Sequence, residues 1–472
     1  MSINPVDTED NYPTVAIVGG GASGTLLASH LLRAGGARVV LIERDERIGR
    51  GVAYGTTFAG HLMNVPAASL TALPGDPGHL LRYARARHDA GTQPTTFIPR
   101  RVYGAYLEHV LRESERLAGP GASLVRWRGE VTGIAAGPRT RRWLMTFADG
   151  SRAHADRVVL ALGNLPPRDP ALASGSWPAD PARYIRDPWR AGALAARAPG
   201  TVLLVGTGLT MVDVALELQA QAPGQRIVAL SRGGLFPHTH RAGGAAPSQG
   251  VPIPEPTASL TALLRFVRSA AVVAEVAGGD WRDAVNALRP VTSDLWAALP
   301  ASEQRRFVER LARYWEIHRH RLAPDVSVAI EELRGSGALT FASGRVEAVA
   351  ETGGGIEVTL RARGSGEPRT LSVGTVVNCT GSTGSVRGGG SRLLEALCES
   401  GIARPHPLAL GLDTCAGGAL LDASGREHDT LFAMGALRRG ELWETTAIPE
   451  LRAQALALAA RLSQRRVLSA VG

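Results

Sequence analysis

The stretch Val15-Ala16-Ile17-Val18-Gly19-Gly20-Gly21-Ala22-Ser23-Gly24 decides the fold of this chain of 472 residues. Its apolar start is typical of a short strand buried on both faces, and residues 22–32 have the apolar spacing of a helix. A second strand is expected over 38–42, and it ends at Glu43. This order of strand, glycine turn, helix and strand indicates a dinucleotide-binding unit in a parallel α/β sheet.

Each glycine of the first turn has a physical role in such a unit. Gly19 permits the tight turn, Gly21 lets a pyrophosphate approach the backbone, and Gly24 lets the helix pack against the strand. Glu43 follows Gly24 at the distance where a carboxylate accepts hydrogen bonds from ribose hydroxyls and repels a 2′-phosphate. The turn therefore predicts FAD or NAD, and we expect FAD. The candidate FAD contacts here are Gly19, Gly21, Ser23, Gly24, Glu43 and Arg44.

A second glycine turn, Gly206-Thr207-Gly208-Leu209-Thr210-Met211, follows the apolar run 201–205 and precedes a helix expected over 212–219. The next expected strand, 226–230, ends in Ser231-Arg232 instead of an acid. A guanidinium at Arg232 can hold a 2′-phosphate, which favours NADPH, although arginine also stacks on adenine and leaves NADH open. The candidate nicotinamide contacts are Gly206, Gly208 and Arg232.

Further strands are expected to end in small-residue turns at Gly163, Gly381 and Gly435. The first two resemble the strand ends at which two-dinucleotide flavoproteins pass from one nucleotide domain to the other. A last helix is expected over 450–462, with Thr446 and Pro449 as signals for its start. If its N-terminus points at the flavin, the helix dipole would stabilise a reduced, anionic isoalloxazine; the alternative is an ordinary capped surface helix.

The sequence thus predicts an α/β protein with two Rossmann-like dinucleotide-binding domains. The FAD domain is discontinuous, with residues 1–165 and 376–472, and the NAD(P)H domain is 166–375. A helical insertion is expected at about 252–324, with helices over 260–276, 281–288 and 302–322.

Composition excludes several classes of protein. All 52 Lys+Arg residues are arginine, so no lysine is present for a Schiff base or a P-loop. The three cysteines, Cys379, Cys398 and Cys415, form no Cys-x-x-Cys pair, which disfavours a dithiol reductase and a zinc ribbon. The net charge is +9, but the arginines are scattered, so we expect no nucleic-acid partner. No signal peptide or membrane span is visible, which predicts a cytoplasmic protein.

Other polar residues are weaker candidates. Asn64 is a possible flavin-side donor, with a turn residue before proline as the alternative. Arg100, Arg101 and Arg241 are candidates for holding an anionic substrate, with a structural role as the alternative. His238 and His240, like His318 and His320, form His-x-His pairs, but no third ligand is suitably close in sequence, so no metal is expected.

Six sequence blocks carry a resemblance to a known family: Gly51-Val52-Ala53-Tyr54, His61-Leu62-Met63-Asn64-Val65-Pro66-Ala67, Phe97-Ile98-Pro99-Arg100, the 206–213 turn, Tyr314-Trp315-Glu316-Ile317-His318-Arg319-His320-Arg321, and Leu442-Trp443-Glu444-Thr445-Thr446-Ala447-Ile448-Pro449-Glu450. Together they resemble the FAD/NAD(P)-binding oxidoreductases related to class B flavin monooxygenases. The usual Gly-Asp at the last strand end is replaced here by Gly435-Ala436.

The resemblance implies a monooxygenase that uses FAD, NADH or NADPH, and O2 through a C4a-hydroperoxyflavin, with a small anionic or amine substrate. Its members include amine N-hydroxylases and a flavin-dependent urate hydroxylase that forms 5-hydroxyisourate. The compact length and the arginine content favour urate. The alternatives are an N-hydroxylase of an amine or amino acid, a reductase or oxidase without oxygen transfer, and a redox-sensing protein without turnover. The sequence identifies no catalytic residue.

Overall fold

The computed structural model describes residues 12–137, 142–241, 250–362 and 367–463. The chain divides into two compact units, which are described one at a time. Unit 1 comprises Met1–Thr57, Pro66–Leu165 and Gly384–Gly472, and unit 2 comprises Phe58–Val65 and Pro166–Thr383. These units differ from the expected domains at two places. The short segment Phe58–Val65 and residues 376–383 both group with unit 2.

Unit 1 is built on a sheet of six strands in the order β17-β18-β7-β1-β2-β3. All neighbouring pairs from β18 to β3 are parallel, and only β17 is antiparallel to its neighbour. The strands are β1 (Thr14–Val18), β2 (Arg38–Glu43), β3 (Ser123–Arg128), β7 (Arg157–Leu160), β17 (Ala419–Leu421) and β18 (Glu427–Ala433). The strand β18 comes from the C-terminal part of the chain and pairs with β7, so both ends of the sequence are needed for one sheet.

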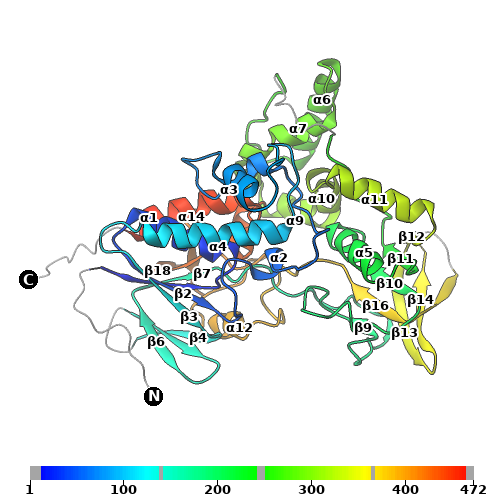
Figure 1. Ribbon diagram of the computed structural model, residues 1–472, viewed down its shortest axis with the longest axis horizontal. Coiled ribbons are helices and arrows are strands. Elements are labelled where there is room, and N and C mark those ends of the chain that lie inside the picture. The colour runs from blue at the N-terminus through cyan, green and yellow to red at the C-terminus, as the bar shows by residue number, and fades with distance from the viewer. Residues whose placement is uncertain (1–11, 138–141, 242–249, 363–366, 464–472) are drawn as a thin grey trace, which may run out of the picture. The chain divides into compact units, whose positions relative to one another are not determined.

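Helices cover one face of this sheet. Figure 1 shows α1 (Ala22–Ala34) between α4 (Arg100–Arg116) and α14 (Ile448–Leu462), and α1 contacts both. The other helical segments of unit 1 are α2 (Gly51–Tyr54), η1 (Ala67–Ser69), α3 (His79–Arg87), α12 (Arg392–Glu399), η3 (Gly435–Arg438) and α13 (Arg439–Leu442). The expected start of the last helix was two residues too late, because Pro449 lies within its first turn.

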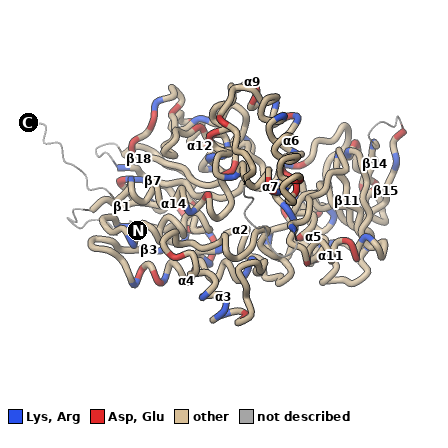
Figure 2. Tube along the Cα trace, turned by 90° about the horizontal axis from the view of Figure 1, so that it is seen from above, with Lys and Arg blue, Asp and Glu red and all other residues tan. Residues whose placement is uncertain are grey.

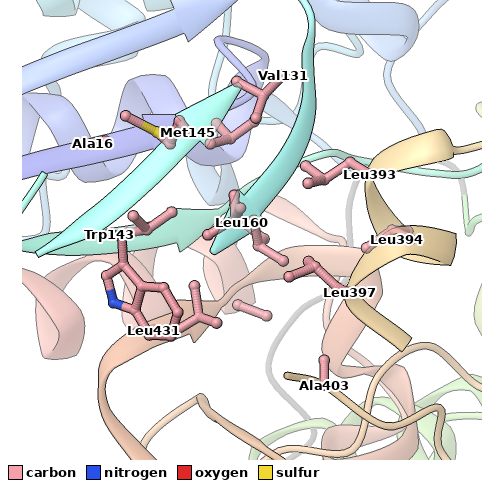
Figure 3. Packing of buried hydrophobic residues seen from close by; sticks show 14 of the residues in the cluster. Ala16, Val131, Trp143, Met145, Leu160, Leu393, Leu394, Leu397, Ala403 and Leu431 are labelled. Atoms are coloured by element: carbon pink, nitrogen blue, oxygen red, sulfur yellow. The ribbon is translucent and has the colours of Figure 1, made fainter. Parts of the chain in front are cut away.

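The opposite face of the sheet packs against a small antiparallel sheet of β4 (Val131–Ala136), β5 (Trp143–Phe147) and β6 (Arg152–Ala155), and against α12. Figure 3 shows this core, to which Met145 of β5, Leu160 of β7, and Leu394 and Leu397 of α12 all belong. These side chains are almost wholly buried. The core of unit 1 therefore joins residues from before 165 and after 384.

Unit 2 contains a parallel sheet in the order β12-β11-β10-β16-β9 and a second sheet in the order β15-β14-β13-β8. In the second sheet the pairs β13·β14 and β14·β15 are antiparallel. The strands are β8 (Ser174–Gly175), β9 (Tyr184–Ile185), β10 (Val202–Val205), β11 (Ile227–Ser231), β12 (Leu339–Ser343), β13 (Arg345–Thr352), β14 (Gly355–Arg361), β15 (Pro368–Val373) and β16 (Thr375–Asn378).

The helices of unit 2 are α5 (Leu209–Gln221), α6 (Leu260–Val276), α7 (Trp281–Ala287), η2 (Arg289–Val291), α8 (Thr292–Ala298), α9 (Ala301–Arg310), α10 (Ala312–Arg319) and α11 (Pro324–Gly335). The expected helix over 260–276 has these bounds. The single helix expected over 302–322 is wrong, because Leu311 (φ −112°, ψ −24°) separates α9 from α10, and α10 ends at Arg319. The apolar spacing continues through this break, which is why the sequence pattern does not reveal it.

Charged side chains of both signs are interleaved along the traced backbone (Figure 2). Many arginines are in ion pairs, such as Arg33 with Glu113 and Arg50 with Glu108. This distribution differs from the contiguous basic stripe of a nucleic-acid-binding face. Within the part of the chain that the structure describes, no helix combines the length and the apolar character needed to cross a membrane.

Candidate dinucleotide sites

The candidate residues of unit 1 come together at one edge of its sheet. Gly19 follows β1, Gly163 comes soon after β7, Gly435 comes soon after β18, and Glu43 ends β2. Because these strands are parallel, their carboxyl ends lie at the same edge, with β1 at the point where the strand order reverses. Ligands of open α/β sheets bind in the crevice at such a point.

The first glycine turn is shaped for close approach. Gly19 has a φ of +108°, and a Cβ there would lie 2.3 Å from the carbonyl oxygen of Ala161. A Cβ at Gly24 would lie 1.9 Å from the carbonyl oxygen of Gly19, so α1 can begin here only because residue 24 has no side chain. At Gly21, by contrast, the nearest atom to an added Cβ is 3.5 Å away.

The N-terminus of α1 is chemically suited to a pyrophosphate. Its N-cap is Gly21, which provides no side-chain cap, and its first turn contains no acid. The first backbone N–H groups of a helix have no partner within the helix, and the helix dipole favours an anion beside them. The residues present therefore fit the diphosphate of FAD.

Glu43 is buried beside this turn. Its Oε2 accepts a hydrogen bond from the Gly20 N–H (2.8 Å), and its Oε1 accepts one from the Asp45 N–H (3.0 Å). A carboxylate has about four lone-pair positions, so it can also accept hydrogen bonds from a ribose. The neighbouring candidate Arg44 is exposed.

Gly435 is fixed by residues that the sequence analysis missed. Its N–H donates to Gln454 Oε1 (2.9 Å), its carbonyl accepts from Thr445 Oγ1 (2.9 Å), and Gln454 Nε2 donates to Thr445 Oγ1 (2.8 Å). The candidate Thr446 is exposed, and the N-cap of α14 is Ala447, so the threonine does not cap this helix. The only indication in the sequence was Gln454 itself, a polar residue within the apolar pattern expected over 451–462.

Two further observations tie Gly435 to the turn after β1. The backbone at Gly435 has a φ of +71°, which glycine adopts readily. A Cβ there would come within 2.8 Å of Ser23 Oγ. Ser23 and Gly435 are therefore neighbours, as expected if both line one site.

Unit 2 repeats this arrangement at the carboxyl edge of its parallel sheet. Gly206 follows β10, Arg232 follows β11, and Gly381 comes soon after β16. Gly206 has a φ of +116°, and a Cβ there would lie 2.4 Å from the carbonyl oxygen of Cys379. Gly208 is the N-cap of α5, without a side-chain cap, and an added Cβ would meet no atom of the described residues within 4 Å. Arg232 is exposed. This edge fits the diphosphate of a nicotinamide dinucleotide.

The weaker candidates have structural partners. Asn64 belongs to unit 2, where its carbonyl oxygen accepts a hydrogen bond from His240 Nε2 (2.9 Å), so its assignment to the flavin stays a prediction. Burial lowers the pKa of His240 to about 4. Arg241 pairs with Asp280 (3.0 Å) and Asp283 (2.9 Å). Arg100 and Arg101 begin α4.

Two of the histidines in the His-x-His pairs take part in contacts with aromatic rings. The His238 ring lies 4.6 Å from that of His318 and 4.9 Å from that of Trp281, which makes an aromatic cluster. A group that the sequence analysis missed lies in unit 1 instead: one ligand atom from each of His79, His109 and Glu113 lies within 4.8 Å of the others. His79 is distant in sequence, so spacing gave no signal.

Comparisons with known proteins concern one segment of the chain and its fold. Residues 16–165 match a family described as FAD-NAD(P)-binding. A search of the curated protein sequences finds no match.

Three solved structures illustrate the similarity of fold. The ornithine hydroxylase of Pseudomonas aeruginosa is 18% identical, with a TM-score of 0.64 over 96% of this chain and 99% of that one. The ornithine N-hydroxylase of Kutzneria sp. 744, with reduced FAD, NADP+ and L-ornithine, is 16% identical, with a TM-score of 0.61 over 96% and 99%. The cadaverine monooxygenase of Erwinia amylovora, bound to FAD, is 13% identical, with a TM-score of 0.63 over 96% and 95%.

Residues 16–165 of the chain therefore match an FAD-NAD(P)-binding family, and the chain has the α/β fold of these hydroxylases and this monooxygenase, with two Rossmann-like domains and a helical region.

Proposed function

We propose that the protein is an FAD-dependent monooxygenase that hydroxylates the nitrogen of a primary amine or amino acid. The reaction consumes amine, O2, NAD(P)H and a proton and yields hydroxylamine, NAD(P)+ and water. The observation that carries the proposal is the presence of one uncapped glycine turn at a strand-order reversal in each unit, which suits one flavin and one diffusible reductant.

Amine substrates are favoured over the urate expected from length and arginine content. The similar structures carry the names of ornithine and cadaverine enzymes. Among the arginines expected to hold an anion, Arg241 has two carboxylate partners. No contact in the described residues favours urate, so urate is kept as a competitor in the experiment below.

The roles of the chain's own residues follow from the geometry. When bound, FAD supplies the hydride acceptor and the site of O2 activation. The first turn of α1 would neutralise the flavin's diphosphate, and Glu43 would orient its ribose. The hydrogen bonds among Gly435, Thr445 and Gln454 fix the backbone just after β18. The first turn of α5 would bind the nicotinamide diphosphate, and Arg232 would hold a 2′-phosphate.

The test is a coupled turnover assay on the FAD-loaded protein. NADPH oxidation is followed with L-ornithine, L-lysine, cadaverine and urate, and H2O2 and the oxygenated product are quantified for each. An amine that converts H2O2 release into a product one oxygen heavier supports the proposal. Equal H2O2 release with every amine would show a reductase or oxidase, and oxygenation of urate alone would restore the earlier prediction.

The choice of nicotinamide is tested at the same time with Arg232→Ala. We expect the KM for NADPH to rise about tenfold, because a hydrogen bond to a charged group is lost, while the KM for NADH stays the same. Equal KM changes for both dinucleotides would remove Arg232 from 2′-phosphate recognition.

A further inference from the structure

Arg321 is an unusual arginine of unit 2 because its side chain is buried. Its residue exposure is 3%. The backbone around it is fixed by pairing with the segment 238–240: the Leu322 N–H donates to the His238 carbonyl (2.8 Å), and the His240 N–H donates to the Leu322 carbonyl (2.9 Å). The backbone that carries the buried Arg321 side chain is thus held in place.

Most of the hydrogen-bonding capacity of this guanidinium is unused. Nη2 donates to Asn286 Oδ1, but Nε and Nη1 have no hydrogen-bond partner among the described residues. No carboxylate of the described residues pairs with Arg321 either. The centroid of the Trp281 ring is 5.9 Å from the Cζ of Arg321. Buried charges in proteins are normally paired and hydrogen-bonded, so this arrangement lacks an anion.

The nearby carboxylates of Asp280 and Asp283 form ion pairs with other arginines. Asp280 pairs with Arg282 (3.2 Å) and with Arg241 (3.0 Å), and Asp283 pairs with Arg241 (2.9 Å). Burial, and then the charge of Arg319, lowers the pKa of Arg321 to about 10, so it is still a cation at neutral pH. Among the described residues, no carboxylate therefore forms an ion pair with the Arg321 guanidinium.

We propose that Arg321 is the subsite for an oxyanion group of a ligand, either the carboxylate of an amino-acid substrate or a phosphate of the nicotinamide dinucleotide. Guanidinium recognises both groups through strong charge-assisted hydrogen bonds. The inference rests on the proposed function and deepens it, since a substrate carboxylate bound at Arg321 favours amino acids over simple diamines.

The first test does not depend on turnover. The FAD-loaded protein is titrated with inorganic phosphate and with acetate, and the thermal unfolding midpoint and the tryptophan fluorescence are recorded. We expect saturable binding that weakens about tenfold or more in Arg321→Gln, because a charged donor is lost. The matched control is Arg334→Gln, a half-exposed arginine of the same unit that pairs with Glu331. Equal anion affinity in wild type and Arg321→Gln overturns the proposal.

A second arm distinguishes the two sources of the oxyanion. If the anion is the substrate's carboxylate, Arg321→Gln raises the KM for L-ornithine and leaves those for cadaverine and NADPH unchanged. If it is the cofactor's phosphate, only the KM for NADPH rises. If hydroxylation continues with every KM unchanged, the subsite is wrong and the proposed function stands.

Arg321→Lys keeps the test decisive if the glutamine variant does not fold. Lysine retains the positive charge but not the planar fork of donors, so anion binding is expected to weaken in this variant too. Unchanged anion binding in Arg321→Lys, with the wild-type unfolding midpoint, would likewise contradict the proposal. Anion binding without any amine hydroxylation would separate the subsite from the proposed reaction.

Discussion

At the scale of single residues, Gly208 provides the sharpest test of the second dinucleotide turn. A Cβ at this N-cap position would enter open space, and its backbone φ of −82° suits any residue. We expect Gly208→Ala to leave the unfolding midpoint unchanged and to raise the KM for the nicotinamide about tenfold, because the methyl group would occupy the place of the diphosphate.

The control for this variant is Gly335→Ala, where an added Cβ also meets open space but no dinucleotide turn is present. Both alanines should be equal in thermal stability, and only Gly208→Ala should affect KM. A KM unchanged in Gly208→Ala would place the nicotinamide elsewhere.

The pKa of His240 leads to a second prediction at this scale. Burial lowers the folded-state pKa to about 4, whereas an unfolded histidine titrates near 6.5. The unfolded chain therefore binds more protons between these values. The stability contributed by neutral His240 is complete above about pH 6.5 and is lost as the pH falls towards 4.

We expect His240→Gln, whose amide can still donate to the Asn64 carbonyl, to lose less stability than wild type between about pH 7 and about pH 4.5. The measurement is the thermal midpoint at each pH, followed by circular dichroism. His88→Gln, at an exposed position, should match wild type. A wild-type slope in His240→Gln would contradict the assignment.

At the scale of secondary-structure elements, the junction between β18 and α14 decides how the flavin edge is held. Replacing Gln454 by Met keeps the side-chain volume but leaves the Gly435 N–H buried without its acceptor. An unsatisfied buried donor costs about 1–3 kcal/mol. We expect Gln454→Met to lower the free energy of unfolding by that amount and to weaken FAD retention during gel filtration.

The matched control is Leu456→Ala, at a half-exposed position of the same helix. A surface substitution of this kind changes stability by about 0.5 kcal/mol or less. If Leu456→Ala releases FAD as readily as Gln454→Met, the effect is a general property of α14 and not of the hydrogen bond at Gly435.

This junction also shows where prediction from sequence ends. The turns at Gly19, Gly206 and Gly208 are predictable, because the backbone approach that a dinucleotide needs is encoded in a few adjacent residues. The hydrogen bonds of Thr445 and Gln454 to Gly435 cannot be predicted in this way, because these residues are far apart in sequence and only the folded structure brings them together. The Arg321 donors that lack a hydrogen-bond partner cannot be predicted either, since a sequence shows an arginine but not its burial.

At the scale of the whole molecule, the strand and helix periods suffice to predict two parallel sheets, but they do not determine which segments complete each unit. The segment Phe58–Val65 groups with unit 2 although its neighbours on both sides belong to unit 1. One of its anchors is the buried ring of His61, whose Nε2 lies 3.1 Å from the carbonyl oxygen of Asp213 on α5. Such a contact depends on tertiary structure and leaves no local pattern.

The discontinuous core of unit 1 leads to the last prediction. Leu394 of α12 is fully buried against strands from the first part of the chain, so truncation there weakens a core made by both parts (Figure 3). Leucine-to-alanine changes in such cores cost about 2–5 kcal/mol. We expect Leu394→Ala to lower the temperature at which FAD fluorescence appears on heating, because unit 1 holds the first glycine turn.

The control is Leu203→Ala in the core of unit 2, which is equally buried. It should lower the stability of unit 2 and raise the KM for the nicotinamide, with a smaller effect on the temperature of FAD release. If both variants release FAD at the same temperature, the assignment of the flavin to unit 1 fails.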